Sequence, residues 1–69
     1  MTTLSNDDKT SIINQHKRNI QYIRYGIELS VIEENSVSAP NQDTLDALNA
    51  NLADLDSKLA ALDAELAAL

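Results

Sequence analysis

Leucines recur at alternating intervals of three and four residues throughout the last 25 residues of the chain. They are Leu45, Leu48, Leu52, Leu55, Leu59, Leu62, Leu66 and Leu69. On an α-helix, residues at these intervals lie along one narrow stripe, which is the pattern by which one helix packs against another. The spacing therefore predicts a helix whose leucine stripe is covered by a second helix.

The size of the chain limits the core that it can form. Its 69 residues make one domain, residues 1–69. A single core in so short a chain rarely supplies more than about 3–5 kcal/mol. The sequence has no cysteine, so disulfides and thiolate metal sites are excluded as reinforcement. We therefore expect self-association to supply stability, and we predict that the chain forms a homo-oligomer.

One cluster of turn-forming residues divides the chain. It spans about 36–41 and contains Pro40, which fixes the boundary between two helices. We expect a first helix over about 6–35 with Ser5 as its N-cap, and a second over about 42–68 capped by Asn41 or Asp43. Two helices of similar length joined by a short loop favour an all-α, coiled-coil-like antiparallel hairpin.

The first helix carries a stripe rich in isoleucine that can meet the leucines. The stripe comprises Ile12, Ile13, His16, Ile20, Ile23, Ile27 and Val31. In an antiparallel hairpin with this loop, facing residues have numbers that sum to about 75–78, which places Ile23 near Leu52 and Leu55. The predicted seam within the chain consists of Ile13, Ile20, Ile23, Ile27, Leu48, Leu52, Leu55, Leu59 and Leu62.

A second apolar stripe lies on the first helix, roughly opposite the isoleucines. It consists of Tyr22, Tyr25, Leu29 and Ile32, at intervals of three, four and three residues. One interpretation is that these side chains lie along the surface beside the loop. The other is that they form a second interface, with another copy of the chain or with a different protein, because a helix that is apolar on two sides is typically covered on both.

Alanines occupy the outward positions of the second helix. They are Ala47, Ala50, Ala53, Ala60, Ala61, Ala64, Ala67 and Ala68. Alanine has the highest helix propensity, so these residues suit a solvent-facing surface. The alternative is that this small-residue face packs closely on another helix.

The distribution of charge bears on the partners. Residues 1–39 hold four basic and five acidic side chains, whereas residues 40–69 hold one basic and six acidic side chains. An acidic chain repels phosphate backbones, so we expect no nucleic-acid partner. No run approaches the roughly 18–20 apolar residues of a membrane span, so we expect no membrane partner. The basic middle of the first helix is suited to lie against the acidic second helix.

The sequence offers little for catalysis. His16 is the only side chain whose ordinary pKa lies near neutrality, and its place on the isoleucine stripe favours a packing role. Adjacent carboxylates such as Glu33 and Glu34 diverge by about 100° on a helix, so they do not form an acid–base pair. Gly26 is the sole glycine, which excludes a glycine-rich phosphate loop. We therefore expect no enzyme activity, no catalytic residues, no metal and no cofactor.

Three segments resemble small helical proteins of tailed bacteriophages, notably those of marine cyanobacterial phages. They are the opening MTTLSNDDK, the middle IELSVIEENSVSAPN and the repeat LNANLADLDSKLAALDAEL. The resemblance spans most of the chain and contains no functional motif. It implies a location only, either the cytoplasm of an infected cell or the virion. A host or phage protein is a further candidate partner.

Two functions fit these patterns. The first is a non-enzymatic structural or assembly protein that self-associates into a helical bundle, as a phage accessory protein or a virion component. The second is a helical adaptor that binds a host protein through the stripe centred on Tyr22, Tyr25, Leu29 and Ile32 and alters its activity. The molecular mass in solution distinguishes them, because the first requires a homo-oligomer.

Overall fold

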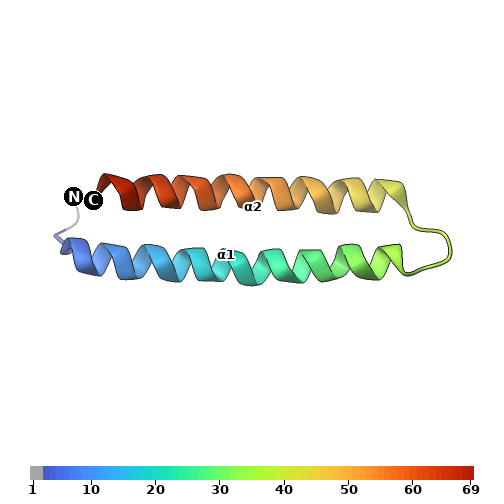
Figure 1. Cartoon of the computed structure of the whole chain (residues 1–69), viewed down its shortest axis with the longest axis horizontal. Coiled ribbons are helices and arrows are strands. Elements are labelled where there is room, and N and C mark those ends of the chain that lie inside the picture. The colour runs from blue at the N-terminus through green and yellow to red at the C-terminus, as the bar shows by residue number, and fades with distance from the viewer. Residues whose placement is uncertain (1–2) are drawn as a thin grey trace.

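The protein is an antiparallel hairpin of two α-helices. The computed structural model describes residues 3–69, which form α1 (Asn6–Asn35) and α2 (Gln42–Ala68) joined by a loop over 36–41. Figure 1 shows the two helices side by side along their whole length, with the start of α1 beside the end of α2. The molecule is a rod with extents of 54 × 17 × 15 Å. The predicted all-α hairpin is confirmed.

Polar side chains define where the helices begin. Ser5 is the N-cap of α1, and its Oγ accepts a hydrogen bond of 3.1 Å from the backbone N–H of Asp8. Asn41, rather than Asp43, is the N-cap of α2, and its side chain accepts from the N–H of Thr44 at 3.0 Å. These bonds satisfy N–H groups that have no partner in the first turn of a helix.

Two further hydrogen bonds fix the register at the ends of the rod. At the loop, the Glu34 carboxylate accepts from the backbone N–H of Asn41 at 2.8 Å. At the other end, the side-chain amide of Asn6 donates to the carbonyl oxygen of Leu69 at 3.3 Å. Both pairs of residue numbers have the same sum and lie within the predicted register, so α1 and α2 run alongside one another without a shift.

The core is a single thin layer between the helices. Among residues 3–69 only Leu55 is buried, with 8 % of its surface exposed. It lies at the middle of α2, and the leucines on either side of it along the seam are half-buried. Two helices can cover only one side of each other, so the chain cannot enclose a larger core. No helix within residues 3–69 has the length and hydrophobicity that a membrane span requires.

Candidate interaction surface

The seam between α1 and α2 determines which side chains the hairpin exposes. On α2 the predicted seam residues Leu48, Leu52, Leu59 and Leu62 are half-buried and Leu55 is buried. On α1 the half-buried apolar residues are Ile13, Ile20, Ile27 and Val31. Their spacing follows a seven-residue repeat, which keeps the apolar side of α1 towards the leucine stripe. The seam therefore fixes which side of α1 faces outward.

Ile23 is a correction to the predicted seam. Its side chain is 56 % exposed and does not take part in the seam. The neighbouring residue Arg24 takes that position, and its side chain is only 30 % exposed. His16, predicted on the same stripe, is exposed, whereas Lys17 beside it is half-buried. Hydrophobicity favours Ile23 over Arg24, and spacing alone places His16 on the stripe, whereas Lys17 and Arg24 continue the seven-residue repeat of the seam.

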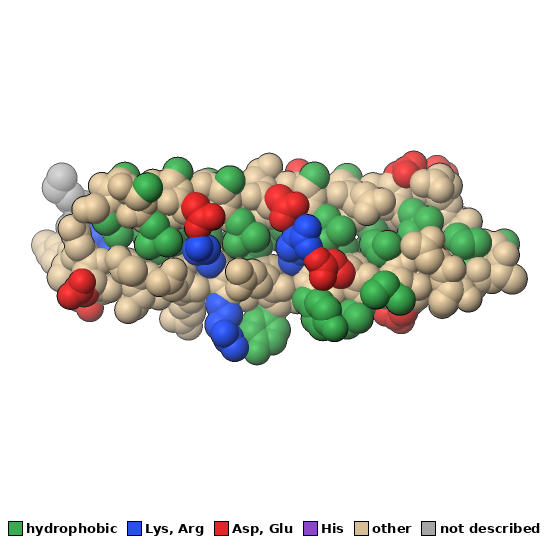
Figure 2. All heavy atoms as spheres, viewed as in Figure 1, with side chains coloured by type: hydrophobic (Ala, Val, Ile, Leu, Met, Phe, Trp, Pro, Cys, Tyr) green, Lys and Arg blue, Asp and Glu red, His purple; other side chains and the backbone are tan. Residues whose placement is uncertain are grey.

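Two salt bridges connect α1 to α2 along the seam. The Lys17 ammonium lies 2.5 Å from the carboxylate of Asp63, and the Nε atom of Arg24 lies 2.8 Å from that of Asp56. The basic residues are seven apart in α1 and the acidic residues are seven apart in α2, so both pairs lie on the same side of the seam. Figure 2 shows acidic groups of α2 meeting basic groups of α1 in this region. The predicted charge complementarity therefore takes the form of two specific pairs.

The Arg24 pair is the better connected of the two. Its guanidinium donates from Nε and Nη2 to the two carboxylate oxygens of Asp56, at 2.8 and 3.3 Å, and from Nη1 to Glu28 one turn along α1. The hydrogen bond from Arg24 lowers the pKa of Asp56, desolvation opposes this shift, and the positive charge of Arg24 adds to it. The same hydrogen bond raises the pKa of Arg24. Both groups are therefore held in their charged forms.

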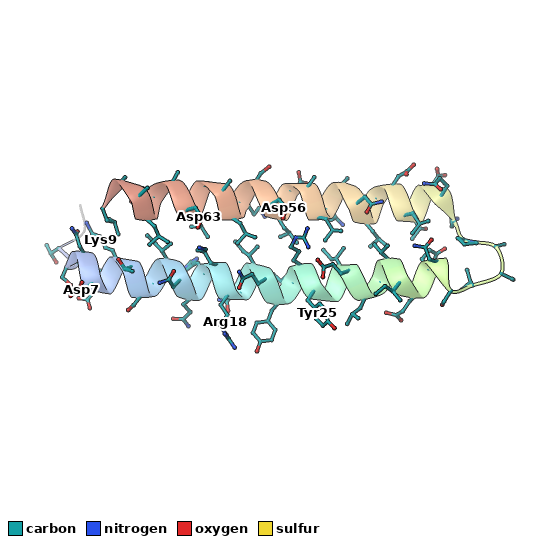
Figure 3. The ribbon with its side chains drawn as sticks, viewed as in Figure 1. Asp7, Lys9, Arg18, Tyr25, Asp56 and Asp63 are labelled. Carbon is teal, nitrogen blue, oxygen red and sulfur yellow. The ribbon has the colours of Figure 1, made fainter. Side chains whose placement is uncertain are left out.

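The predicted second interface is exposed on the side of α1 away from α2. The exposed fractions are 68 % for Tyr22, 62 % for Tyr25, 40 % for Leu29 and 63 % for Ile32. Figure 3 shows Tyr25 and Arg18 on the side of α1 opposite α2, whereas Asp56 and Asp63 lie towards α1. We call these four apolar residues the outer face. The structure brings them together on one surface and leaves them uncovered by the chain itself.

Polar groups border the outer face at its two ends. The Arg18 guanidinium lies over the Tyr22 ring, 5.6 Å from its centroid, which is within the range of a cation–π interaction. Arg18, Gln21, Tyr22 and Tyr25 line a shallow hollow of about 240 Å³. Glu33, exposed in the last turn of α1, follows Ile32 at the other end. The outer face is thus apolar in its middle, basic at one end and acidic at the other.

The outward side of α2 differs from that of α1. Its alanines are all exposed, as are Asp54, Ser57 and Lys58 on the same helix. Alanine side chains offer little apolar area to a partner compared with tyrosine, leucine or isoleucine. The larger apolar area on the hairpin surface therefore lies on α1.

The arrangement is suited to binding an apolar surface. Within residues 3–69, no group of three or more His, Cys, Asp or Glu side chains is placed to hold a metal ion. His16 is exposed, and the carboxylates of Asp56 and Asp63 on α2 are paired with Arg24 and Lys17 of α1. Exposing the apolar surface of tyrosine and isoleucine side chains to water is unfavourable in free energy. Contact with another protein surface removes this cost.

Comparisons with protein-family models, curated proteins and solved structures found no match to this chain. The resemblance to phage proteins is therefore a prediction from the sequence alone.

Proposed function

We propose that this protein is a non-enzymatic helical assembly protein that self-associates through the outer face of α1. The observation that carries the proposal is the uncovered row of Tyr22, Tyr25, Leu29 and Ile32. Tyr25, at the middle of this row, lies on the side of α1 opposite α2 (Figure 3). In a monomer, α1 leaves this row in water. In an oligomer, α1 is covered on both sides, as its two apolar stripes require.

The thin core supports the same proposal. A hairpin in which Leu55 is the only buried residue among those described has little stability of its own. Burying apolar surface contributes about 25 cal/mol for each Å² removed from water. Joining two hairpins through their outer faces would add a second apolar layer to the first, so self-association and folding would stabilise each other.

The biological setting follows from the resemblance given by the sequence. We propose a phage accessory protein or virion component, in the cytoplasm of an infected cell or in the particle. In either place, a small helical bundle would act as a structural unit and not as a catalyst.

An adaptor is the second candidate, and the spacing of the outer face favours it. Side chains at intervals of three and four residues on one exposed helix match the way in which an amphipathic helix enters a groove on another protein. In that case Tyr22, Tyr25, Leu29 and Ile32 would be covered by a host or phage protein and the free protein would be monomeric.

The mass in solution tests the proposal. Light scattering coupled to size-exclusion chromatography should give a mass above the 7.5 kDa of one chain for the wild type at high concentration. Leu29→Glu should shift the protein towards the monomer, because it places a charge inside an apolar contact. Ala64→Glu adds the same charge on the exposed side of α2 and is the matched control, so it should leave the mass unchanged.

Two outcomes contradict the proposal. A wild type that is monomeric at every concentration would favour the adaptor. An oligomer that Ala64→Glu dissociates and Leu29→Glu does not would place the interface on the alanine side of α2.

A further inference from the structure

We infer that the partner on the outer face is a second copy of this chain, paired with α1 antiparallel to α1 about a two-fold axis near Ile27. This inference rests on the proposed self-association and adds the orientation and composition of the contact. The charges at the ends of α1, the spacing of the outer face and the acidic surface of α2 each support it.

The intervals between the residues of the outer face are the same in both chain directions. Its residues follow one another at intervals of three, four and three, so an antiparallel copy can align the rows without a shift. Tyr22 of one copy then lies opposite Ile32 of the other, and Tyr25 lies opposite Leu29. Each tyrosine meets an aliphatic side chain, and the hollow of about 240 Å³ beside Tyr22 and Tyr25 can receive it.

The end charges distinguish antiparallel from parallel pairing. Arg18 borders the outer face one turn before Tyr22, and Glu33 borders it directly after Ile32. In the antiparallel pair, Arg18 of each copy lies beside the last turn of the other α1, close to Glu33. In a parallel pair, arginine would face arginine and glutamate would face glutamate, which is unfavourable.

The last turn of α1 lacks the positive charge that a helix C-terminus favours. It contains Glu33 and Glu34 and no basic residue, although the helix dipole places partial negative charge there. Glu34 is hydrogen-bonded to the N–H of Asn41, whereas Glu33 is exposed. Arg18 of a second copy would supply the missing positive charge at both ends of the symmetric contact.

Pairing through α1 also keeps the acidic helices apart. Residues 40–69 carry six acidic side chains and one basic side chain, so two copies of α2 repel each other. Residues 1–39, with four basic and five acidic side chains, are close to neutral. A contact between two α1 helices places both α2 helices on the outside of the dimer, where water and salt screen their charge.

The outer face is short, so the contact that it forms is weak. Stable interfaces bury about 800 Å² on each partner, and four side chains over three helical turns provide less than this. We therefore expect a dimer in exchange with its monomer, whose mass rises with concentration, rather than a permanent complex.

A distance measurement tests the orientation. The chain has no cysteine, so Ser11→Cys gives a single site for a spin label on exposed α1, outside the outer face. In the antiparallel dimer the two labels should lie about 48 Å apart, since each is sixteen residues from the axis at about 1.5 Å per residue. In a parallel dimer they should lie within about 25 Å, because packed helices are about 8–10 Å apart. Pulsed electron spin resonance separates these distances.

Charge exchange gives a second test. Arg18→Glu should weaken the dimer because it places two glutamates together at each end, and Glu33→Arg should weaken it in the same way. The double variant Arg18→Glu/Glu33→Arg should restore the wild-type dissociation constant, because it returns an opposite charge to each contact. Circular dichroism checks that every variant remains helical.

The outcomes separate this inference from the proposed function. A dimer with a label separation near 48 Å and rescue by the double variant supports both. A dimer with a separation below about 25 Å, or a double variant that is no tighter than the single variants, overturns the antiparallel inference and leaves self-association standing. A wild type that stays monomeric over a range of about 1 μM to 1 mM overturns both.

Discussion

Arg24 shows how a cationic residue can hold a seam position between two helices. The stem of its side chain is apolar and can lie along the leucines, while the guanidinium reaches Asp56 on α2 and Glu28 on α1. Lys17 does the same one heptad earlier, with Asp63 as its partner. These residues select a register, because a slip of α2 by one turn would separate both pairs at once. At the scale of single residues, the charged pairs specify the register of the two helices, which the uniform leucine stripe cannot specify.

The pKa of Asp56 gives a prediction about pH. Because its pKa is lowered in the folded protein, its contribution to stability is present above its unfolded pKa of about 3.9 and is lost as the pH falls through the lower folded value. Asp56→Asn should therefore lower the free energy of unfolding at neutral pH. The difference from the wild type should shrink below about pH 4. Urea denaturation followed by circular dichroism at several pH values measures it.

Asp54→Asn is the matched control for this prediction. It removes the same charge from the same helix, and the described residues include no salt bridge to Asp54. The two variants thus change the net charge equally. If both lose the same stability with the same dependence on pH, the interaction with Arg24 does not contribute and the lowered pKa of Asp56 has another cause.

At the scale of the helices, α2 is easier to predict than α1. Eight leucines at regular intervals define its seam, and Pro40 and Asn41 define its start. The helix α1 has apolar residues on several sides, and hydrophobicity alone favours Ile23 for a seam position that Arg24 occupies. The signal that identifies Arg24 is its seven-residue spacing from Lys17, together with the equal spacing of Asp56 and Asp63. The outer face follows from its own spacing, but what covers it depends on a partner outside the chain.

The contrast between Leu55 and Ile23 gives a prediction at this scale. Leu55→Ala should lower the free energy of unfolding by about 2–5 kcal/mol, since it truncates the one buried side chain among the described residues. Ile23→Ala should cost less than about 1 kcal/mol, because most of that side chain is already in water. Denaturant titration of both variants gives the comparison. Equal losses would mean that Ile23 packs in the seam as the leucine does.

At the scale of the whole molecule, the hairpin is a rod with apolar residues on two sides of one helix. Its inner seam is covered by α2, and its outer face carries Tyr22 and Tyr25 in water. A chain of 69 residues has little stability to spare, so covering that face has a large effect relative to the total. Folding, self-association and the proposed assembly role are therefore linked through the same four side chains.

Tyrosine fluorescence measures the coverage of the outer face most directly. The chain contains two tyrosines and no tryptophan, and both tyrosines belong to this face, so the emission reports on nothing else. We predict that quenching by acrylamide is strong in dilute, monomeric protein and falls as the mass rises with concentration. Leu29→Glu should keep the strong quenching at every concentration. A wild type whose mass rises while its tyrosine quenching stays constant would contradict the account, because the chains would then associate through another surface.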